Sequence, residues 1–408
     1  MAKQPKIRFK GFTEEWKEAP LSEYLMVSNE RNDNDRYTAQ DIQSVSGEYG
    51  VVNQIEFQGR SFAGASLLNY RVIHNGEIAY TKSPLKLSPY GIIKANKSVT
   101  GIVSALYGVY KVKKGDPNFI QDYFDLLARL NNYLHPLVNK GAKNTLLITD
   151  EDAISGNVVF PKTDEQKAIS NLISHISTTI LRRETELEKL KNIKRALLEK
   201  LFPKDGQTIP AIRFRGFDGE WEPTVLGQKI KEINRKNANS TAPIMMIAAG
   251  NGFIYQSDRY SFNNAGKSLQ QYIVLNRNEL AYNHGASKLH PYGCCYALLS
   301  EDSARIPYVY HCFSTTCCPE FLSTILNERE AENQLRKLIS SGARMDGLLN
   351  ISFEAYSSIS LKIPKTPEQE KIAKLVNSLN KTISLRERQL TLLKHSKQAL
   401  LEQMFVNN

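Results

Sequence analysis

The apolar residues of this chain form two long stripes of the same design. In residues 164 to 202, and again in residues 367 to 405, apolar side chains recur in alternating steps of four and three. This period, kept over about five heptads, predicts two helices that each carry a coiled-coil seam. At about 1.5 Å per residue each helix would be about 58 Å long. The apolar seam positions are Ile169, Ile173, Ile176, Ile180, Leu187, Leu190, Leu197 and Leu201, and then Ile372, Val376, Leu379, Ile383, Leu390, Leu393, Leu400 and Met404.

The two stripes also share their interruptions, which predict how the helices meet. Arg183 and Lys194 interrupt the first stripe, and Arg386 and Lys397 interrupt the second at matching positions. A parallel, in-register pair would place arginine on arginine and lysine on lysine, so we expect an antiparallel coiled coil. In the alternative, each helix packs only on its own half of the chain. That arrangement explains the stripes but not their matched interruptions.

Each stripe follows a body of mixed β-type and helical runs. Residues 21 to 160 contain GEIAYTK and TGIVSALYGVYKV, and residues 226 to 363 contain NELAYNH and CCYALLS. Each body therefore predicts an α/β domain with a twisted sheet. The segment IRFKGFTEEW at 7 to 16 returns as IRFRGFDGEW at 212 to 221, which indicates a duplication. We expect an α+β protein with pseudo-twofold symmetry, divided into residues 1–160, 161–205, 206–363 and 364–408.

The two bodies also match in a loop whose composition suits nucleic acid. AYTKSPLKLSPYG at 79 to 91 corresponds to AYNHGASKLHPYG at 281 to 293. Lysine, histidine, tyrosine and asparagine around turn residues are suited to phosphates and base edges, although a solvated loop is the plain alternative. The positions that differ, Thr81/Asn283, Lys82/His284 and Ser83/Gly285, are where different bases would be distinguished. The candidate DNA contacts are Lys82, Lys86, Tyr90 and Lys94 in the first half, and Asn283, His284, Lys288, His290 and Tyr292 in the second.

A second matched loop follows the helical run of each body. It reads NKGAKNTLL at 139 to 147 and SSGARMDGLLN at 340 to 350. Lys143 and Arg344 are candidates for phosphate contacts there. The glycines could equally cap a helix whose negative end the basic side chains complement.

Charge supports a polyanionic partner. The chain of 408 residues has 53 Lys and Arg against 42 Asp and Glu, a net charge of +11. Basic proteins gain affinity for nucleic acid through counterion release. The first residues lack the apolar core of a signal peptide and no apolar run reaches membrane length, so we expect a cytoplasmic protein without a membrane partner. The five cysteines, all in the second half, favour free thiols over a metal site or disulfides.

Taken together, these motifs resemble the specificity subunit of Type I restriction-modification systems over essentially the full chain. The resemblance rests on IRFxGFxxEW before each body, on PKTDEQ (161 to 166) and PKTPEQ (364 to 369) before each long helix, and on the duplicated helix. It implies that the bodies are target recognition domains, each reading half of a bipartite site in double-stranded DNA. It also implies that the helices set the spacing and that methylation and restriction subunits, two of each, dock around them.

The chain shows no motif for chemistry of its own. We find no phosphate-binding loop, no convincing glycine-rich cofactor turn, and no Asn-Pro-Pro-aromatic tetrapeptide of adenine methyltransferases. We therefore expect a non-catalytic subunit without cofactor or metal. The resemblance implies S-adenosylmethionine, ATP and Mg for the partner subunits. Two competing hypotheses are a stand-alone enzyme acting on DNA and a coiled-coil scaffold that never contacts nucleic acid.

Overall fold

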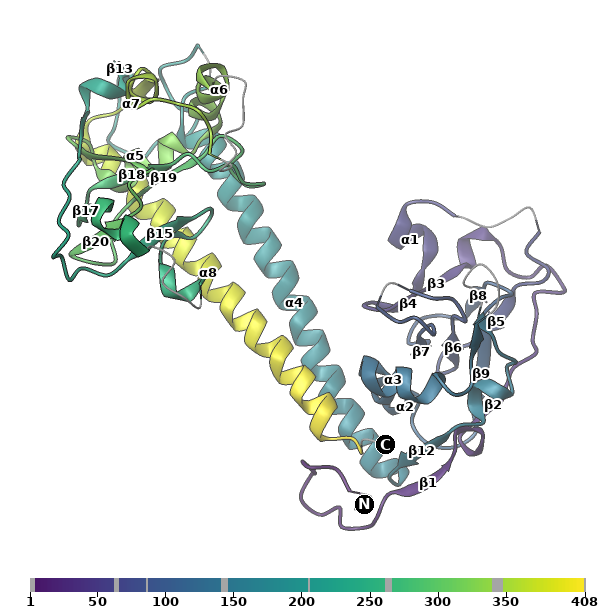
Figure 1. Ribbon diagram of the computed structural model, residues 1–408. Coiled ribbons are helices and arrows are strands. Elements are labelled where there is room, and N and C mark those ends of the chain that lie inside the picture. The colour runs from purple at the N-terminus through teal and green to yellow at the C-terminus, as the bar shows by residue number, and fades with distance from the viewer. Residues whose placement is uncertain are drawn as a thin grey trace. The chain divides into compact units, whose positions relative to one another are not determined.

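The computed structural model describes residues 4–61, 66–85, 87–140, 146–204, 206–260, 266–339 and 348–406. The chain divides into two compact units (Figure 1). Unit 1 comprises residues 1–185 and 388–408, and unit 2 comprises residues 186–387. Each of the two long helices therefore contributes a segment to both units. Among the described residues, no helix is both long enough and apolar enough to span a bilayer.

Unit 1 is built on a four-stranded antiparallel sheet with the order β2-β9-β6-β7. Two-stranded pairs β1-β12, β3-β4, β5-β8 and β10-β11 surround it, and helix α2 packs against β7. The strands are β1 (Lys17–Pro20), β2 (Leu25–Val27), β3 (Gln43–Ser46), β4 (Gly50–Asn53), β5 (Arg71–Ile73), β6 (Ile78–Tyr80), β7 (Ile93–Ala95), β8 (Gly101–Val103), β9 (Gly108–Val112), β10 (Asn139–Lys140), β11 (Leu146–Leu147) and β12 (Asn157–Phe160). The short helices are α1 (Gln54–Gln58), α2 (Pro117–Asp125) and α3 (Leu127–Leu134).

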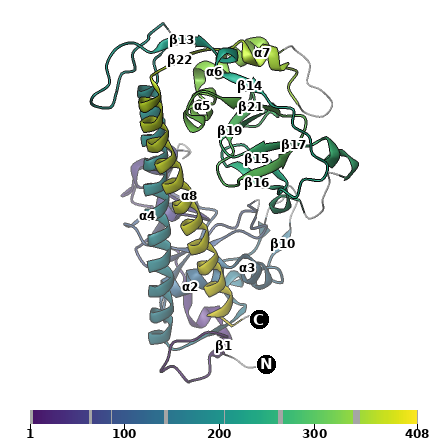
Figure 2. The ribbon, with the colours of Figure 1, turned by 90° about the vertical axis from the view of Figure 1, so that its left-hand side faces the viewer.

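Unit 2 repeats this topology with the sheet order β14-β21-β18-β19 and the pairs β13-β22, β15-β16 and β17-β20. Helix α5 packs against β19 (Figure 2), and α2 packs against β7 in the same way. The strands are β13 (Glu222–Val225), β14 (Ile230–Glu232), β15 (Met245–Ala248), β16 (Gly252–Tyr255), β17 (Ile273–Asn276), β18 (Leu280–Asn283), β19 (Cys294–Ala297), β20 (Ser303–Ile306), β21 (His311–Thr315) and β22 (Ser360–Ile363). The short helices are α5 (Pro319–Leu326), α6 (Arg329–Leu338) and α7 (Phe353–Ser357). The two copies of the sequence thus fold in the same way.

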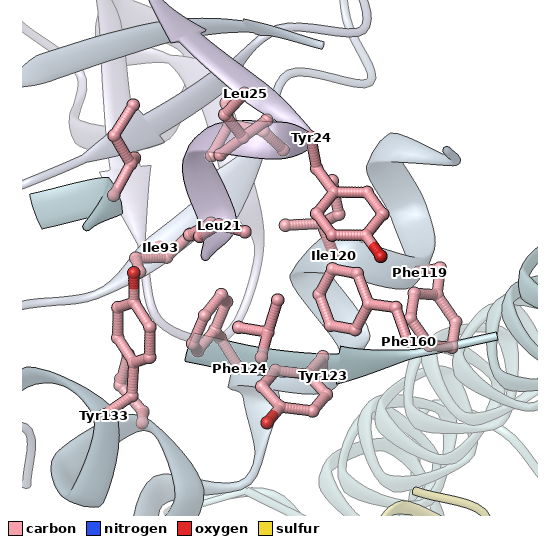
Figure 3. Packing of buried hydrophobic residues seen from close by; sticks show 14 of the residues in the cluster. Leu21, Tyr24, Leu25, Ile93, Phe119, Ile120, Tyr123, Phe124, Tyr133 and Phe160 are labelled. Atoms are coloured by element: carbon pink, nitrogen blue, oxygen red, sulfur yellow. The ribbon is translucent and has the colours of Figure 1, made fainter. Parts of the chain in front are cut away.

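The central strands β6 and β18 bury side chains on both faces, because each separates two hydrophobic clusters. Alternate side chains of a strand point to opposite faces. In β6, Ile78 and Tyr80 join the larger core with α2, whereas Ala79 joins a smaller cluster with β5, β8 and β9. Figure 3 shows the larger core, where Phe119 of α2 packs edge-on against Phe160 of β12 at a centroid distance of 5.1 Å. In β18, Leu280 and Tyr282 again face away from Ala281.

The duplicated motifs fasten the start of each half to a long helix. The Arg8 guanidinium contacts both carboxylate oxygens of Glu165, at 2.7 and 2.8 Å. Arg213 contacts Glu368 in the same bidentate way, with both distances 2.8 Å. Because both carboxylates are buried, these charges need their arginine partners.

The glutamine that follows each of these glutamates positions the neighbouring short helix. The Gln166 side-chain oxygen accepts a hydrogen bond of 2.9 Å from the backbone N–H of Asp116, which is the N-cap of α2. The Gln369 side-chain oxygen accepts one of the same length from the N–H of Cys318, the N-cap of α5. The Glu-Gln pair of each motif is therefore part of the structural frame.

The long helices are α4 (Thr163–Leu201) and α8 (Thr366–Gln403), within a few residues of the predicted stripes. Every apolar residue of the predicted seam is buried or half-buried. Some large apolar side chains that lie off the seam are exposed, whereas others, such as Leu401, are buried. The exposed ones are Leu181 (51%) and Ile193 (56%) on α4, and Leu385 (56%) and Leu392 (57%) on α8.

The ends of these helices complete the two cores. In unit 1, Phe405 lies just after α8 and packs on Phe119 at a centroid distance of 5.1 Å. Arg129 donates a hydrogen bond of 2.9 Å to the carbonyl of Leu401 and so holds the same helix end. In unit 2, Phe202 lies just after α4 and packs edge-on against Trp221 at 6.0 Å. Each core therefore contains the end of the helix that begins in the other unit.

Ion pairs join the two helices within each unit. Glu184 of α4 lies 2.6 Å from Lys394 of α8 in unit 1, and Lys191 of α4 lies 2.9 Å from Glu387 of α8 in unit 2.

The lysines that interrupt the seam act on acidic residues of the bodies, the half-buried Glu328 and the buried Asp122. Burial raises the pKa of Glu328 to about 7, an effect that the charge of Lys194 opposes. Burial, together with Asp125, raises the pKa of Asp122 to about 8, and Lys397 is among the charges that oppose the increase.

The five cysteines are free thiols, as predicted. Cys294, Cys295 and Cys312 are buried in unit 2, and burial raises the pKa of each thiol, that of Cys294 to about 12. Within the described residues, no group of three or more His, Cys, Asp or Glu side chains is placed to hold a metal ion.

Candidate nucleic-acid interface

The Pro-Tyr-Gly loops, residues 81–91 of unit 1 and 284–293 of unit 2, each join a central strand to the edge strand of the sheet. The Tyr80 hydroxyl donates a hydrogen bond of 2.7 Å to the carbonyl of Tyr90. The Tyr282 hydroxyl donates one of 2.5 Å to the carbonyl of Tyr292. The turn also requires a glycine, because Gly91 has φ +87° and a Cβ there would lie 2.9 Å from a ring carbon of Tyr80. Both loops are therefore fixed at their base by the same contacts.

The structure brings the Pro-Tyr-Gly loop of each unit to described residues at or just after the end of the second matched loop. The Lys82 ammonium donates a hydrogen bond of 3.2 Å to the carbonyl of Ile148, just after the second matched loop. In unit 2, Nδ1 of His284 lies 2.7 Å from the carbonyl oxygen of Leu349, which is near the end of the second matched loop. Lys82 and His284, predicted to distinguish bases, thus occupy equivalent structural positions.

Two predicted contacts of unit 1 are held in ion pairs. The Lys82 ammonium lies 2.5 Å from the Asp150 carboxylate, which also pairs with Arg71 at 2.7 Å. The Lys94 ammonium lies 2.6 Å from Asp125, and the Lys94 residue is only 7% exposed. For either lysine to contact a phosphate, its ion pair would have to open. The structure therefore gives both lysines a role in holding the body together.

Tyr90 and Tyr292, the candidate tyrosines of the two loops, are half-buried. Tyr90 packs edge-on against His135 at a centroid distance of 5.6 Å, and Tyr292 packs on the core of unit 2. Their backbone carbonyls accept the hydrogen bonds that fix each loop, and their rings pack against other side chains of the same unit. Neither ring stands free at the loop tip.

The unit 2 residues are divided between internal and surface positions. Asn283 accepts a hydrogen bond of 2.9 Å from the backbone N–H of Gly285, and Nδ1 of His290 lies 3.2 Å from the Glu332 carboxylate. His284 is buried at 4% exposure. Lys288, by contrast, is exposed. Of these side chains, that of Lys288 is placed to meet a phosphate without rearrangement.

Lys86, Lys143 and Arg344 lie outside the described residues. The acidic partners Asp125, Asp150 and Glu332 were not expected from the sequence, because no spacing rule pairs them with residues so far away in the chain. They decide which basic side chains are neutralised. The exposed Leu87 and Leu289 were also missed, although the sequence places both immediately after the loop lysines.

The folded chain is a duplicated α+β protein. Each unit carries a Pro-Tyr-Gly loop on its four-stranded sheet, and each contains a segment of both long helices. No protein-family model matches the sequence, and no curated protein sequence matches it. Among solved structures, the chain is similar to the Type I restriction-modification S subunit from M. genitalium, with a TM-score of 0.60 and 12% identity, over 99% of this chain and 100% of that one. It also matches the HsdS subunit from Thermoanaerobacter tengcongensis, with a TM-score of 0.43 and 16% identity, over 99% of each chain. At these identities the likeness concerns the fold: the chain has the fold of a Type I S subunit, as its motifs predicted.

Proposed function

We propose that this chain is the sequence-specific DNA-binding specificity subunit of a Type I restriction-modification complex. The observation that carries the proposal is the duplication. Two units of the same topology each carry a Pro-Tyr-Gly loop beside a second matched loop, in a chain with the fold of an S subunit. Each unit would be a target recognition domain that reads one half of a bipartite double-stranded DNA site. The net charge of +11 favours this polyanionic partner.

In this proposal α4 and α8 form an antiparallel coiled coil that sets the distance between the half-sites. Three features support the pairing: the buried seam, the Glu184–Lys394 and Lys191–Glu387 ion pairs, and the helix ends inserted in the two cores. A pseudo-twofold axis would let the chain address DNA as a dimer does, with reading heads about 34 Å apart. The number of unread bases would then depend on helix length.

The proposal assigns no reaction to this chain. Two methylation subunits would use S-adenosylmethionine to modify adenine, and two restriction subunits would use ATP and Mg, in the cytoplasm where the host DNA lies. The role of this chain would be to bring them to the target. Lys288, Tyr90 and Tyr292 would lie at or behind the DNA-contacting surface, and Lys82 and Lys94 would contribute only after their ion pairs open.

The experiment that tests the proposal is to co-express the chain with its neighbouring methylation subunit and map N6-methyladenine across the host genome at single-base resolution. We expect a split motif, in which two short half-sites flank a fixed run of unread bases. A strain that lacks this chain is the control and should lose that motif. Methylation that is absent, or that is the same in the control strain, would contradict the proposal.

A further inference from the structure

Two leucines stand exposed at the tips of the Pro-Tyr-Gly loops. Leu87 is 72% exposed and Leu289 is 60% exposed. In unit 1, Leu85 and Ser88 exchange backbone hydrogen bonds of 3.0 and 3.1 Å. In unit 2, the backbone N–H of Ser287 donates one of 3.1 Å to the carbonyl of His290. Each leucine therefore occupies the third position of a closed four-residue turn.

Other residues shared by the two loops have clear folding roles. Tyr80 and Tyr282 are buried and staple the loops, and Gly91 has a left-handed backbone that its neighbours require. Neither leucine belongs to the hydrophobic clusters found among the described residues, and the contact of Leu289 with Gly250 leaves that side chain 60% exposed. Folding accounts for the shared tyrosine and glycine and leaves the shared leucine unexplained.

A single exposed leucine is ordinary on a protein surface. Here the same side chain stands at the same turn position in both units, although some of the neighbouring residues differ. Ser88 in unit 1 corresponds to His290 in unit 2, and the buried, ion-paired Lys94 corresponds to Tyr296. An exposed leucine that follows a lysine at the same turn position in both units indicates a contact made by both units.

Resting on the proposed function, we infer that Leu87 and Leu289 make apolar contacts with the bases of the first and second half-site. A leucine side chain has no charge and no hydrogen-bond donor with which to bind a phosphate, so we expect an apolar partner on DNA. That partner is the methyl group of thymine, or a base face opened at a deformable step. The closed turn holds the side chain in place before binding, which limits the entropy lost on contact. The exposed Lys288 precedes Leu289 and can contact a phosphate beside it.

The test uses the complex of this chain with its methylation subunits and a duplex carrying the two mapped half-sites. Leu87→Ala and Leu289→Ala are compared with wild type and with Val99→Ala, which alters a side chain that is 70% exposed outside the loop. We expect each leucine variant to bind the target about 5- to 100-fold more weakly. Base preference should relax only in the half-site of the altered unit. Binding to scrambled duplex should not change, Val99→Ala should match wild type, and Leu87→Met should retain most of the affinity.

Two DNA substitutions distinguish the source of the contact. Replacing thymine by deoxyuracil removes the methyl group and should reproduce the Leu87→Ala loss if that group is the partner. A 2-aminopurine at the contacted step should brighten on binding of wild type, and not of the variant, if the leucine opens the step. Variants that bind the target like wild type with unchanged base preference would overturn the inference alone. A wild-type complex that does not discriminate target from scrambled DNA would overturn the proposed function and the inference with it.

Discussion

Arg8 and Glu165 form a bidentate ion pair, with Nε–Oε1 at 2.7 Å and Nη2–Oε2 at 2.8 Å, between the first motif of the chain and the first turn of α4. The glutamate side chain is 3% exposed and the arginine side chain 13%. Glu165 is therefore a buried carboxylate whose charge depends on one partner. Arg213 and Glu368 repeat the arrangement in unit 2.

We expect Arg8→Ala to lower the free energy of unfolding by about 3 to 5 kcal/mol, because it leaves the Glu165 charge buried and unpaired. The double variant Arg8→Leu with Glu165→Leu should be less damaging, since it removes both charges. Chemical denaturation of wild type, Arg8→Leu, Glu165→Leu and the double variant, the four members of a double-mutant cycle, measures the coupling. A loss below about 1 kcal/mol for Arg8→Ala would show that water reaches the carboxylate.

We expect a substitution at the end of each long helix to destabilise the unit in which that helix ends, and not the unit in which it begins. Phe405→Ala should loosen the body of unit 1, and Phe202→Ala should loosen that of unit 2, each by about 3 to 5 kcal/mol through loss of a buried ring. Hydrogen exchange read by mass spectrometry would localise the effect to strands β1 to β12 or β13 to β22. Leu392→Ala is the matched control, because that side chain is 57% exposed on α8. Exchange that rises equally in both bodies would contradict the pattern.

Asp122 predicts a pH-dependent stability. Its folded-state pKa is raised from 3.8 to about 8, chiefly by burial. Between these values the unfolded chain has lost a proton that the folded chain keeps, so stability falls as pH rises and the loss is complete above about pH 8. Below about pH 3.8 both states are protonated and the effect vanishes.

Asp122→Asn should therefore raise the free energy of unfolding at pH 7 by about 2 to 4 kcal/mol, with a gain that shrinks towards pH 4. Asp125→Asn is the matched comparison on the same helix, and it should destabilise because it leaves Lys94 without its carboxylate. Thermal unfolding at pH 4, 7 and 8.5 measures both. A gain for Asp122→Asn that does not vary with pH would show that its cause is not ionisation.

The long helices predict that the spacer of the target can be changed without changing its half-sites. The Glu184–Lys394 and Lys191–Glu387 ion pairs mark two positions at which α4 and α8 contact each other. One heptad inserted into each helix between these pairs keeps the seam in phase and adds about 10 Å. Methylation mapping should then show the same half-sites separated by about three more base pairs.

A heptad inserted in α4 alone is the control for this experiment. It would misalign the two seams and should abolish methylation at a defined spacing. If the double insertion gives an unchanged spacer, the helices do not set the distance. If it alters the half-sites themselves, the insertion has disturbed the reading units.

The sequence alone determined the duplication, the long helices and the fold class, because these depend on local periodicity and on repeated motifs that survive without any knowledge of contacts. The seam residues Ile169 and Leu201 could be identified from spacing, and both are buried. The tertiary structure alone decided the partners of the basic side chains. Lys82 and Lys94 looked available for phosphate, but Asp150 and Asp125, distant in the chain, neutralise them. Exposure and ion pairing depend on which side chains the fold brings within a few ångströms of one another. The periodicity of a sequence carries no information about those distances.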